Sequence, residues 1–512
     1  MLGGKLHLSK IKNVDLARRN LLVHPPEPPI EIVFPDPLNS VYVGRTKIFN
    51  VPFYWSYENV ANPHIAVVGI SGSGKSYFIK TFLLRSSYVW NANALIIDWA
   101  GEYKDWVRQT GGKIISLGKG SFLNLLDLGG MKPYNRIKQI MRTLGILTDI
   151  DQYPEQKRLT EQALEKAYIK AKYKMDRNDQ KDELGKGLTP PTLRDVVNEL
   201  KEQATLGTYE FPAELENAIY RLKQFTRSGE DFFAQQSTVS LDEITTSGLV
   251  DLDLSGLPDE TFRALGALTI LQFLKEKMRL TGWESKKGVK FIIVLDEAWK
   301  IAGDEKSDAV MIIREGRKYN FCMIVASQNP TDINEAIFSN VGTTFILKIK
   351  FDKYLDYLQS TLNFSNYMRN AISKFGVGEC AVNMAFTTPT QYPPTFLISK
   401  IEGEEPAEEY FLDLELALTP EQKKKMEFNT RVAFLKKELT RKLVQYGLNL
   451  DKVKETISAF EKEKRHLGVV KFVIMLERYG IARQNISKLL KESGLDDRVI
   501  ISIFAKARSG GV

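Results

Sequence analysis

Short apolar runs alternate with amphipathic stretches along most of residues 61–401. The runs are rich in Val, Ile and Leu without polar alternation, which is the pattern of strands buried on both faces. Helices between such strands predict an α/β fold with a mostly parallel sheet covered on both sides. Two later runs, 376–383 and 394–399, predict antiparallel edge strands. The runs that predict core strands are residues 64–68, 94–98, 113–117, 248–254, 289–296, 321–327 and 343–350.

Residues 132–237 follow a different pattern, in which apolar side chains recur every three or four positions. Thr192 begins one of these segments with Asp195 three positions later, which is a helix-start signal. This region therefore predicts a helical subdomain inserted into the core, which is divided into residues 61–131 and 238–401. The expected helices are residues 135–147, 155–172, 192–203 and 212–225.

The flanking segments differ from the core in composition. Residues 1–60 are proline-rich and predict an extended N-terminal arm with one short strand at 41–44. Residues 402–418 are acidic and predict a linker. Residues 419–512 predict an all-helical C-terminal domain, whose last three helices are expected at 469–479, 483–492 and 496–508.

The positive charge is concentrated in that C-terminal segment. Residues 419–512 hold 21 Lys and Arg against 11 Asp and Glu, a net charge of +10, whereas the preceding 418 residues carry −2. Three interpretations stay open: a helix-turn-helix DNA module, a non-specific surface for DNA or a partner, and a solvated basic cap. Asp496 and Asp497 weigh against the first, because they open the recognition helix and would repel phosphates.

Cysteine content and hydropathy exclude several classes of protein. Cys322 and Cys380 are the two cysteines, too few for a disulfide framework or a four-thiolate zinc site. No apolar run approaches the ~20 residues of a membrane span. The first 21 residues lack the pattern of a signal peptide. We therefore expect a cytoplasmic protein without a transmembrane anchor of its own, and any membrane role would be peripheral.

Residues 69–76 match G-x-x-x-x-G-K-[ST] between an apolar strand and a helix, which is the context of a phosphate-binding loop. The glycines allow the backbone N–H groups and the helix N-terminus to approach the β-phosphate. Lys75 would place a charge on the β- and γ-phosphates, and Ser76 a hydroxyl on magnesium. The expected cofactors are ATP and Mg²⁺. The expected nucleotide-binding residues are Gly69, Ser71, Gly72, Ser73, Gly74, Lys75, Ser76 and Tyr77.

Acidic and amide side chains stand at the ends of three other predicted strands. Asp296 is expected to hold magnesium through water, and Glu297 to polarise the attacking water. Gln328 is expected to sense the γ-phosphate. Asp98 and Glu102 follow the second core strand, where a parallel sheet binds its ligand. The alternative is that Asp98 caps a helix and Glu102 is solvated.

Four motifs stand out together: Gly69-x-x-x-x-Gly-Lys-Ser, Asp98-x-x-Gly-Glu-Tyr103, Asp296-Glu297, and Arg314-Glu-Gly-Arg317-Lys318 followed by Gln328. With these motifs the chain resembles the HerA/FtsK superfamily of hexameric DNA-pumping ATPases, above all HerA and the conjugative ATPases of type IV secretion. The resemblance spans roughly residues 41–399. It implies a RecA-like core, a homo-hexameric ring with ATP at the subunit interfaces, and double-stranded DNA in the central channel.

The same resemblance implies that Arg317 is an arginine finger that neutralises charge on a neighbouring subunit's γ-phosphate, with Arg314 or Lys318 as alternatives. The expected catalytic residues are thus Lys75, Glu102, Glu297, Arg317 and Gln328. One difference from HerA is that the proline-rich first 60 residues show no pattern of the β-barrel that precedes the HerA nucleotide domain.

The expected function is an ATP-driven translocase of double-stranded DNA. Residues 119–122 and 300–307 are the candidate DNA-contacting loops. A nuclease, or a membrane channel of a secretion complex, is the expected partner, depending on whether the pathway is repair, DNA transfer or genome packaging. The alternatives are a secretion or pilus-assembly ATPase with the same core, and a nucleotide-gated coupling scaffold that recruits cargo.

Overall fold

The computed structural model describes residues 40–402 with short gaps, together with parts of 28–35 and of 452–504. The acidic linker and most of the basic C-terminal segment expected from the sequence lie outside the described residues. The gaps are 49, 91, 119, 182–184, 186, 207–211, 282–287, 298–300, 302–306 and 388–394; beyond 40–402 the described residues are 28, 30–33, 35, 452, 455–456, 465–478, 480–492, 500–501 and 503–504.

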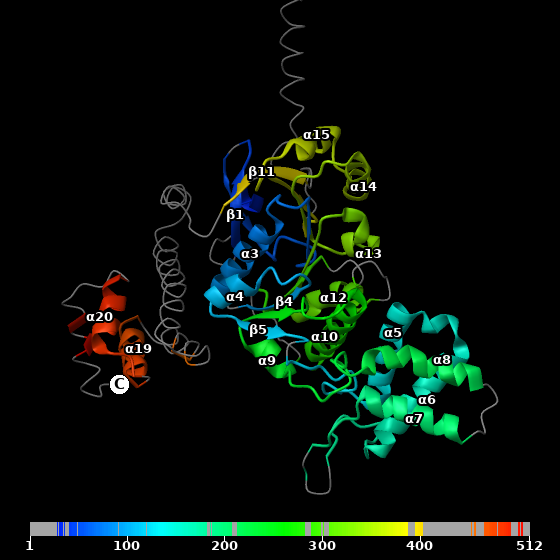
Figure 1. Ribbon diagram of the computed structural model, residues 1–512. Helices are drawn as coiled ribbons and strands as arrows, with labels where there is room; N and C mark the ends of the chain where they lie inside the picture. Colours follow the sequence, from blue (N-terminus) through cyan, green and yellow to red (C-terminus); the bar gives the residue numbers. More distant parts are fainter. Residues whose placement is uncertain are drawn as a thin grey trace, which may run out of the picture.

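An eleven-stranded mixed sheet forms the core (Figure 1), in the order β2-β1-β11-β10-β9-β3-β8-β7-β4-β6-β5. The seven neighbouring strands from β9 to β5 in this order are parallel. They are the seven predicted core strands, and the prediction of a parallel sheet is confirmed. Their bounds are β3 Ile65–Val68, β4 Asn93–Asp98, β5 Lys113–Ser116, β6 Leu249–Asp253, β7 Phe291–Asp296, β8 Phe321–Ser327 and β9 Thr343–Ile346.

Four antiparallel strands extend one edge of this sheet. β10 (Cys380–Met384) and β11 (Thr395–Ile401) are the two predicted late strands. β1 (Val41–Thr46) and β2 (Pro52–Trp55) lie within the segment expected to be an extended arm, where only one short strand was predicted. β1 pairs with β11, and a Cβ on Gly44 would lie 2.2 Å from the carbonyl oxygen of Lys400. Residues 41–55 are therefore part of the central sheet.

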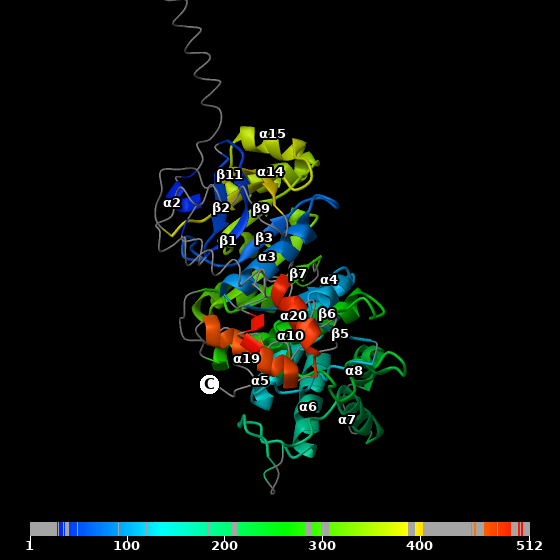
Figure 2. The ribbon, with the colours of Figure 1, turned by 90° about the vertical axis from the view of Figure 1, so that its left-hand side faces the viewer.

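Helices cover both faces of the sheet, because the strands are apolar on both sides. α3 (Lys75–Trp90) and α4 (Lys104–Gln109) pack on one face, which is turned toward the viewer in Figure 2. The opposite face carries a longer series (Figure 1), together with the short α9 (Leu241–Thr246). That series is α10 Glu260–Thr281, α12 Asp308–Glu315, α13 Glu335–Phe338, α14 Asp352–Leu362 and α15 Asn366–Lys374.

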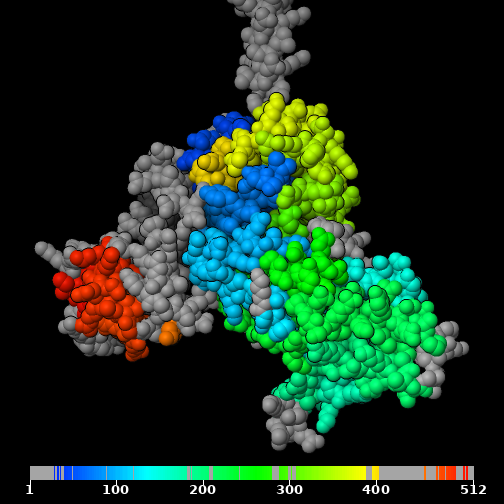
Figure 3. Space-filling view, viewed as in Figure 1, coloured from blue at the N-terminus to red at the C-terminus, as the bar shows by residue number. Residues whose placement is uncertain are grey.

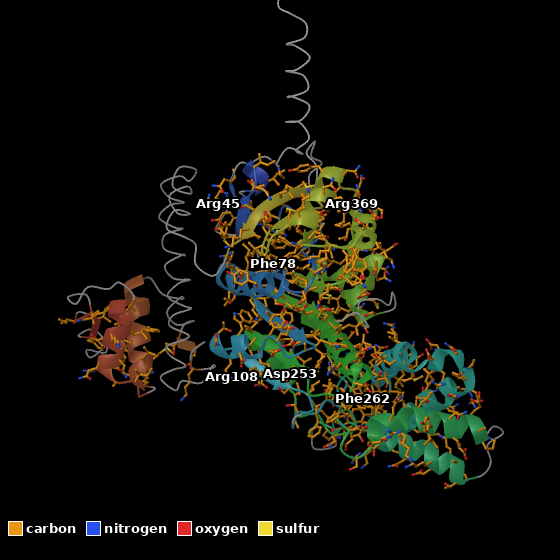
Figure 4. The ribbon with its side chains drawn as sticks, turned by 45° about the horizontal axis from the view of Figure 1, so that its top comes forward. Arg45, Phe78, Arg108, Asp253, Phe262 and Arg369 are labelled. Atoms are coloured by element: carbon orange, nitrogen blue, oxygen red, sulfur yellow. The ribbon has the colours of Figure 1, made fainter. Side chains whose placement is uncertain are left out.

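The predicted inserted helices form a lobe that projects from the core (Figure 3). They are α5 Pro133–Thr148, α6 Pro154–Lys170, α7 Leu193–Thr205 and α8 Pro212–Lys223. Thr192 and Asp195 form the expected capping box at the start of α7. The lobe shares one hydrophobic cluster with the core. Phe262 at the start of α10, which is labelled in Figure 4, contacts Phe225 with ring centroids 5.4 Å apart.

A buried ion cluster also ties the lobe to the core. Asp308, the first residue of α12, is 1% exposed and accepts a hydrogen bond from Lys275 of α10, which is equally buried. Arg142 of α5 lies 3.6 Å from the same carboxylate and donates to the Met311 sulfur. The position of α12 thus depends on charges from both the lobe and the core.

Two of the predicted C-terminal helices are described, α19 (Arg465–Arg478) and α20 (Arg483–Glu492). They pack on each other through their own apolar cluster, which includes Val473, Leu476 and Ile486. The predicted third helix, residues 496–508, lies largely outside the described residues. None of the helices described by the structure has the length and apolar character needed to cross a bilayer.

Asp251 on β6 is an unusual residue for a sheet interior. It is fully buried, and neither carboxylate oxygen has a hydrogen-bond partner among the described residues. Burial raises the pKa of Asp251 to about 8; the carboxylates of Asp98 and Asp253 act in the same direction, and Lys104 opposes them. The folded protein therefore retains a proton on Asp251 that the unfolded chain loses above its ordinary pKa of 3.8.

This proton makes stability fall with rising pH, from about pH 4 to about pH 8, because the native state binds more protons than the unfolded state in that window. We predict that Asp251→Asn raises the melting temperature, and that the difference from the parent grows with pH up to about 8. Calorimetry across this range checks it, with Asp105→Asn on the exposed side of α4 as control. A pH-independent difference would contradict the prediction.

Candidate nucleotide-hydrolysis site

The predicted phosphate loop connects β3 to α3 with the backbone geometry that its glycines permit. Gly72 and Gly74 have φ values of +72° and +109°, in the region that side chains disfavour. A Cβ on Gly69 would lie 2.7 Å from the Ser73 hydroxyl oxygen, which itself donates to the Ile70 carbonyl at 2.7 Å. The chain therefore curls tightly, and α3 begins within the loop.

Lys75 folds back across this loop. Its Nζ donates to the Gly69 carbonyl at 2.9 Å and lies 3.8 Å from the Glu297 Oε1. The side chain is 7% exposed. Burial lowers the pKa of Lys75, while Glu297, Asp296 and Glu102 act in the opposite direction. A cation is thus held at the mouth of the loop among acids from two other strand ends.

The end of β7 supplies two of those acids. Asp296 is the last residue of the strand, and its Cα lies opposite that of Asp98 on β4. Glu297 follows with a left-handed φ of +57°, which is uncommon for a residue with a side chain. Its N–H donates to the Ala326 carbonyl of β8 at 3.2 Å. The chain therefore turns sharply here, with the Glu297 carboxylate beside Lys75.

The Asp98 carboxylate accepts hydrogen bonds from the backbone of the turn after β4. Its Oδ1 accepts from the N–H groups of Ala100 at 3.2 Å and Gly101 at 2.7 Å, and its Oδ2 from the N–H of Tyr103 at 2.8 Å. The side chain is 1% exposed. Asp98 therefore stabilises the turn that precedes α4 and does not cap the helix itself, whose N-cap residue is Tyr103.

That turn places Tyr103 between two of the predicted site residues. The Tyr103 hydroxyl donates to Asp296 Oδ2 at 2.6 Å, and the Tyr103 and Ser76 side chains are also hydrogen-bonded. Burial raises the pKa of Tyr103 well above its usual value, so it remains a donor. Tyr103 belongs to the sequence motif that follows β4. The sequence did not indicate a site role for it, because a tyrosine is more often a core residue.

Asp296 is left with one oxygen free of protein donors. Its Oδ1 is buried and has no hydrogen-bond partner among the described residues. Burial raises the pKa of Asp296 to about 6, and the Tyr103 hydroxyl opposes this shift. Such a carboxylate, close to the Ser76 hydroxyl through Tyr103, has the chemistry to take a hard divalent cation or its water.

Other predicted site residues are exposed or lie outside the described part of the chain. Glu102 and Gln328 are exposed, and Glu102 interacts electrostatically with both Lys75 and Asp296. Arg314 and Lys318 are exposed at the end of α12 and in the 3₁₀ turn η3 (Gly316–Tyr319). Arg317 belongs to that turn, and its side chain lies outside the described residues, as do Lys119 and most of the second candidate DNA loop.

The fold and the loop together define a P-loop nucleotide-binding protein with a RecA-like sheet. A family model described as the central domain of the helicase HerA matches residues 41–273. The solved structure of VirB4 of Thermoanaerobacter pseudethanolicus has a similar fold, with a TM-score of 0.59, 21% identity, and coverage of 72% of this chain and 97% of that one.

Curated relatives extend the similarity. The DNA double-strand break repair helicase HerA of Saccharolobus solfataricus is 25% identical over 342 residues, which cover 62% of this chain and 61% of the relative. The DNA import protein CedB of Sulfolobus acidocaldarius is 20% identical over 371 residues, 70% of this chain and 55% of that protein. The chain thus spans less than two thirds of the length of these relatives. The family-model match and these relatives support a relationship to the HerA/FtsK-type superfamily.

Removing the hydrogen bond from Tyr103 to Asp296 should shift the pH dependence of ATP hydrolysis. A hydroxyl donor stabilises the charged form of Asp296, so Tyr103→Phe should raise the pKa of Asp296 further. Metal binding by Asp296, which is proposed below, needs the ionised carboxylate. In that proposal, the acidic limb of the ATP hydrolysis profile should move upward by about one pH unit. Rates measured from pH 5 to 9 check this, with the exposed Tyr134→Phe as control. An unshifted acidic limb would show that Tyr103 has a packing role alone.

Proposed function

We propose that this chain is a magnesium-dependent ATPase that works as a homo-hexameric motor on double-stranded DNA. The observation that carries the proposal is the cluster at the mouth of the loop: Lys75 lies 3.8 Å from Glu297, beside an Asp296 oxygen that no described protein group satisfies. A cation, an acid placed to polarise water and a metal-binding carboxylate are the groups that phosphoryl transfer to water requires.

Each residue has a distinct task in this proposal. Lys75 and the N–H groups at the start of α3 bind the β- and γ-phosphates. Ser76 and Asp296 hold the magnesium ion, which neutralises charge on the phosphate oxygens when bound. Glu297 orients and polarises the attacking water. Gln328, exposed directly after β8, contacts the γ-phosphate, and Glu102 adjusts the electrostatics of the cleft.

The DNA part of the proposal rests on the relatives, whose names describe a DNA repair helicase and a DNA import protein. A ring of this superfamily would bring Arg317 of one subunit to the γ-phosphate of the next, with Arg314 or Lys318 as alternative cations. A nuclease or a membrane channel is the kind of partner that would set the pathway.

Replacing the central residues tests the catalytic assignment. Lys75→Ala should abolish nucleotide binding, and Glu297→Gln should bind ATP but hydrolyse it at least about 100-fold more slowly, because the water loses its polarising carboxylate. The measurement is steady-state ATP hydrolysis with and without double-stranded DNA. Lys223→Ala and Glu216→Gln, exposed on α8, are matched controls.

Each outcome has a clear meaning. Parent-like hydrolysis in both variants would refute the site. Hydrolysis that double-stranded DNA leaves unchanged would refute the DNA motor and favour a secretion or pilus-assembly ATPase. A parent ring that binds ATP with almost no turnover would favour a nucleotide-gated scaffold.

A mixing experiment tests the trans-acting arginine. Arg317→Ala and Glu297→Gln should each be inactive alone, but random mixed rings should recover about a quarter of the parent activity, because that fraction of interfaces pairs an intact Glu297 with an intact Arg317. Parallel mixtures with Arg314→Ala and Lys318→Ala identify the cation. If no mixture exceeds its separate components, the cation does not act between subunits.

A further inference from the structure

The turn between α15 and β10 is built onto the phosphate loop. The N–H of Gly378 donates to the carbonyl of Ser73 at 3.1 Å. The loop and the turn are also in close approach at Gly74, where a Cβ would lie 3.6 Å from the Gly378 nitrogen. A segment about 300 residues away in sequence therefore shares a border with the loop.

Hydrogen bonds on several sides hold this turn. Glu379 accepts from the N–H of Gly376 at 2.6 Å and from the Lys47 ammonium at 2.7 Å. The carbonyl of Gly378 accepts from the N–H of Ile401 on β11 at 2.7 Å. Gly378 has a φ of +82°, which glycine adopts at low cost. The turn is therefore preorganised before any ligand binds.

This fixed turn presents an apolar side chain to solvent. Val377 is 73% exposed, the highest value among the large apolar side chains that the structure describes. Phe375, two positions earlier, is by contrast 1% exposed and anchors the turn in the core. A rigidly held apolar side chain beside a phosphate-binding loop can supply the apolar contact that lines small-molecule sites.

The order of the strands indicates which part of a ligand would reach Val377. β3, which leads into the loop, has β8 and β7 on one side and β9 and β10 on the other. Glu297 and Asp296, which mark the hydrolysed end of the triphosphate, lie on the β7 side. The turn precedes β10 on the opposite side. A nucleotide whose terminal phosphates lie at Glu297 therefore directs its nucleoside toward the turn.

We propose that Val377 contacts the nucleobase of the bound nucleoside triphosphate, with its isopropyl group packed on the face of the base. The proposal rests on the proposed function, since it requires a nucleotide in the loop. The flat, largely apolar face of a base gains from leaving water, whereas inorganic tripolyphosphate has no such group and would not use Val377.

The test separates base binding from phosphate binding. In the Glu297→Gln background, which limits hydrolysis, we expect Val377→Ser to weaken ATP binding about tenfold, as expected for the loss of two buried methyl groups. Binding of inorganic tripolyphosphate should stay within about twofold of its reference value. Titration calorimetry with magnesium measures both ligands. Val377→Ile should retain ATP binding, and Tyr220→Ser, at a residue 71% exposed on α8, is the remote control.

Three results would overturn the inference. Unchanged ATP affinity in Val377→Ser would show that no base contact exists. Equal weakening for ATP and tripolyphosphate would show that the turn only supports the phosphate loop. Loss of the hexamer in Val377→Ser, with ATP affinity unchanged, would assign Val377 to a subunit contact. If the Glu297→Gln reference binds neither ligand, the proposed function itself fails, a result distinct from these three.

Discussion

The hydrogen bond between Tyr103 and Asp296 joins the two halves of the site. It connects the turn after β4 to the end of β7, while Tyr103 also contacts Ser76 of the phosphate loop. The bond depends on Asp98, whose carboxylate binds three backbone N–H groups and so sets the path of that turn. One buried aspartate thus positions a second through a tyrosine, and the other oxygen of the second has no hydrogen-bond partner among the described residues.

The parallel strands bring several aspartate carboxylates close together, and the structure reduces the repulsion between them in different ways. Their carboxyl ends meet at one edge, and Asp98 lies opposite both Asp253 and Asp296 in the strand register. Asp98 is stabilised by backbone donors, and Asp253 by Lys104 at 2.7 Å and by Ser255 (Figure 4 labels Asp253). Asp251 avoids the repulsion by staying protonated. Asp296 retains a pKa of about 6, low enough to ionise at neutral pH.

α12 links the inserted lobe to the residues proposed as trans-acting cations. Asp308 at the start of this helix is held by Lys275 from the core and Arg142 from the lobe, and the helix leads to Arg314 and to the turn that contains Arg317. A buried carboxylate between two cations tolerates little displacement, because separating the charges leaves one of them unpaired. Motion of the lobe would therefore move the proposed trans-acting cation.

The sequence by itself determined the parallel core, the phosphate loop and the inserted helices. The seven apolar runs became β3 to β9, and Thr192 with Asp195 marked the start of α7, because buried strands and capped helices have local signatures.

Tertiary structure decided what depends on distant partners. β1 gains its place in the sheet by pairing with β11, and β2 by pairing with β1, so the proline-rich composition around them was misleading. The direction of the Asp98 carboxylate, the Tyr103 bond to Asp296 and the position of Val377 beside the loop arise between segments separated by up to about 300 residues. No local pattern encodes them, since each depends on which strand ends the sheet brings together.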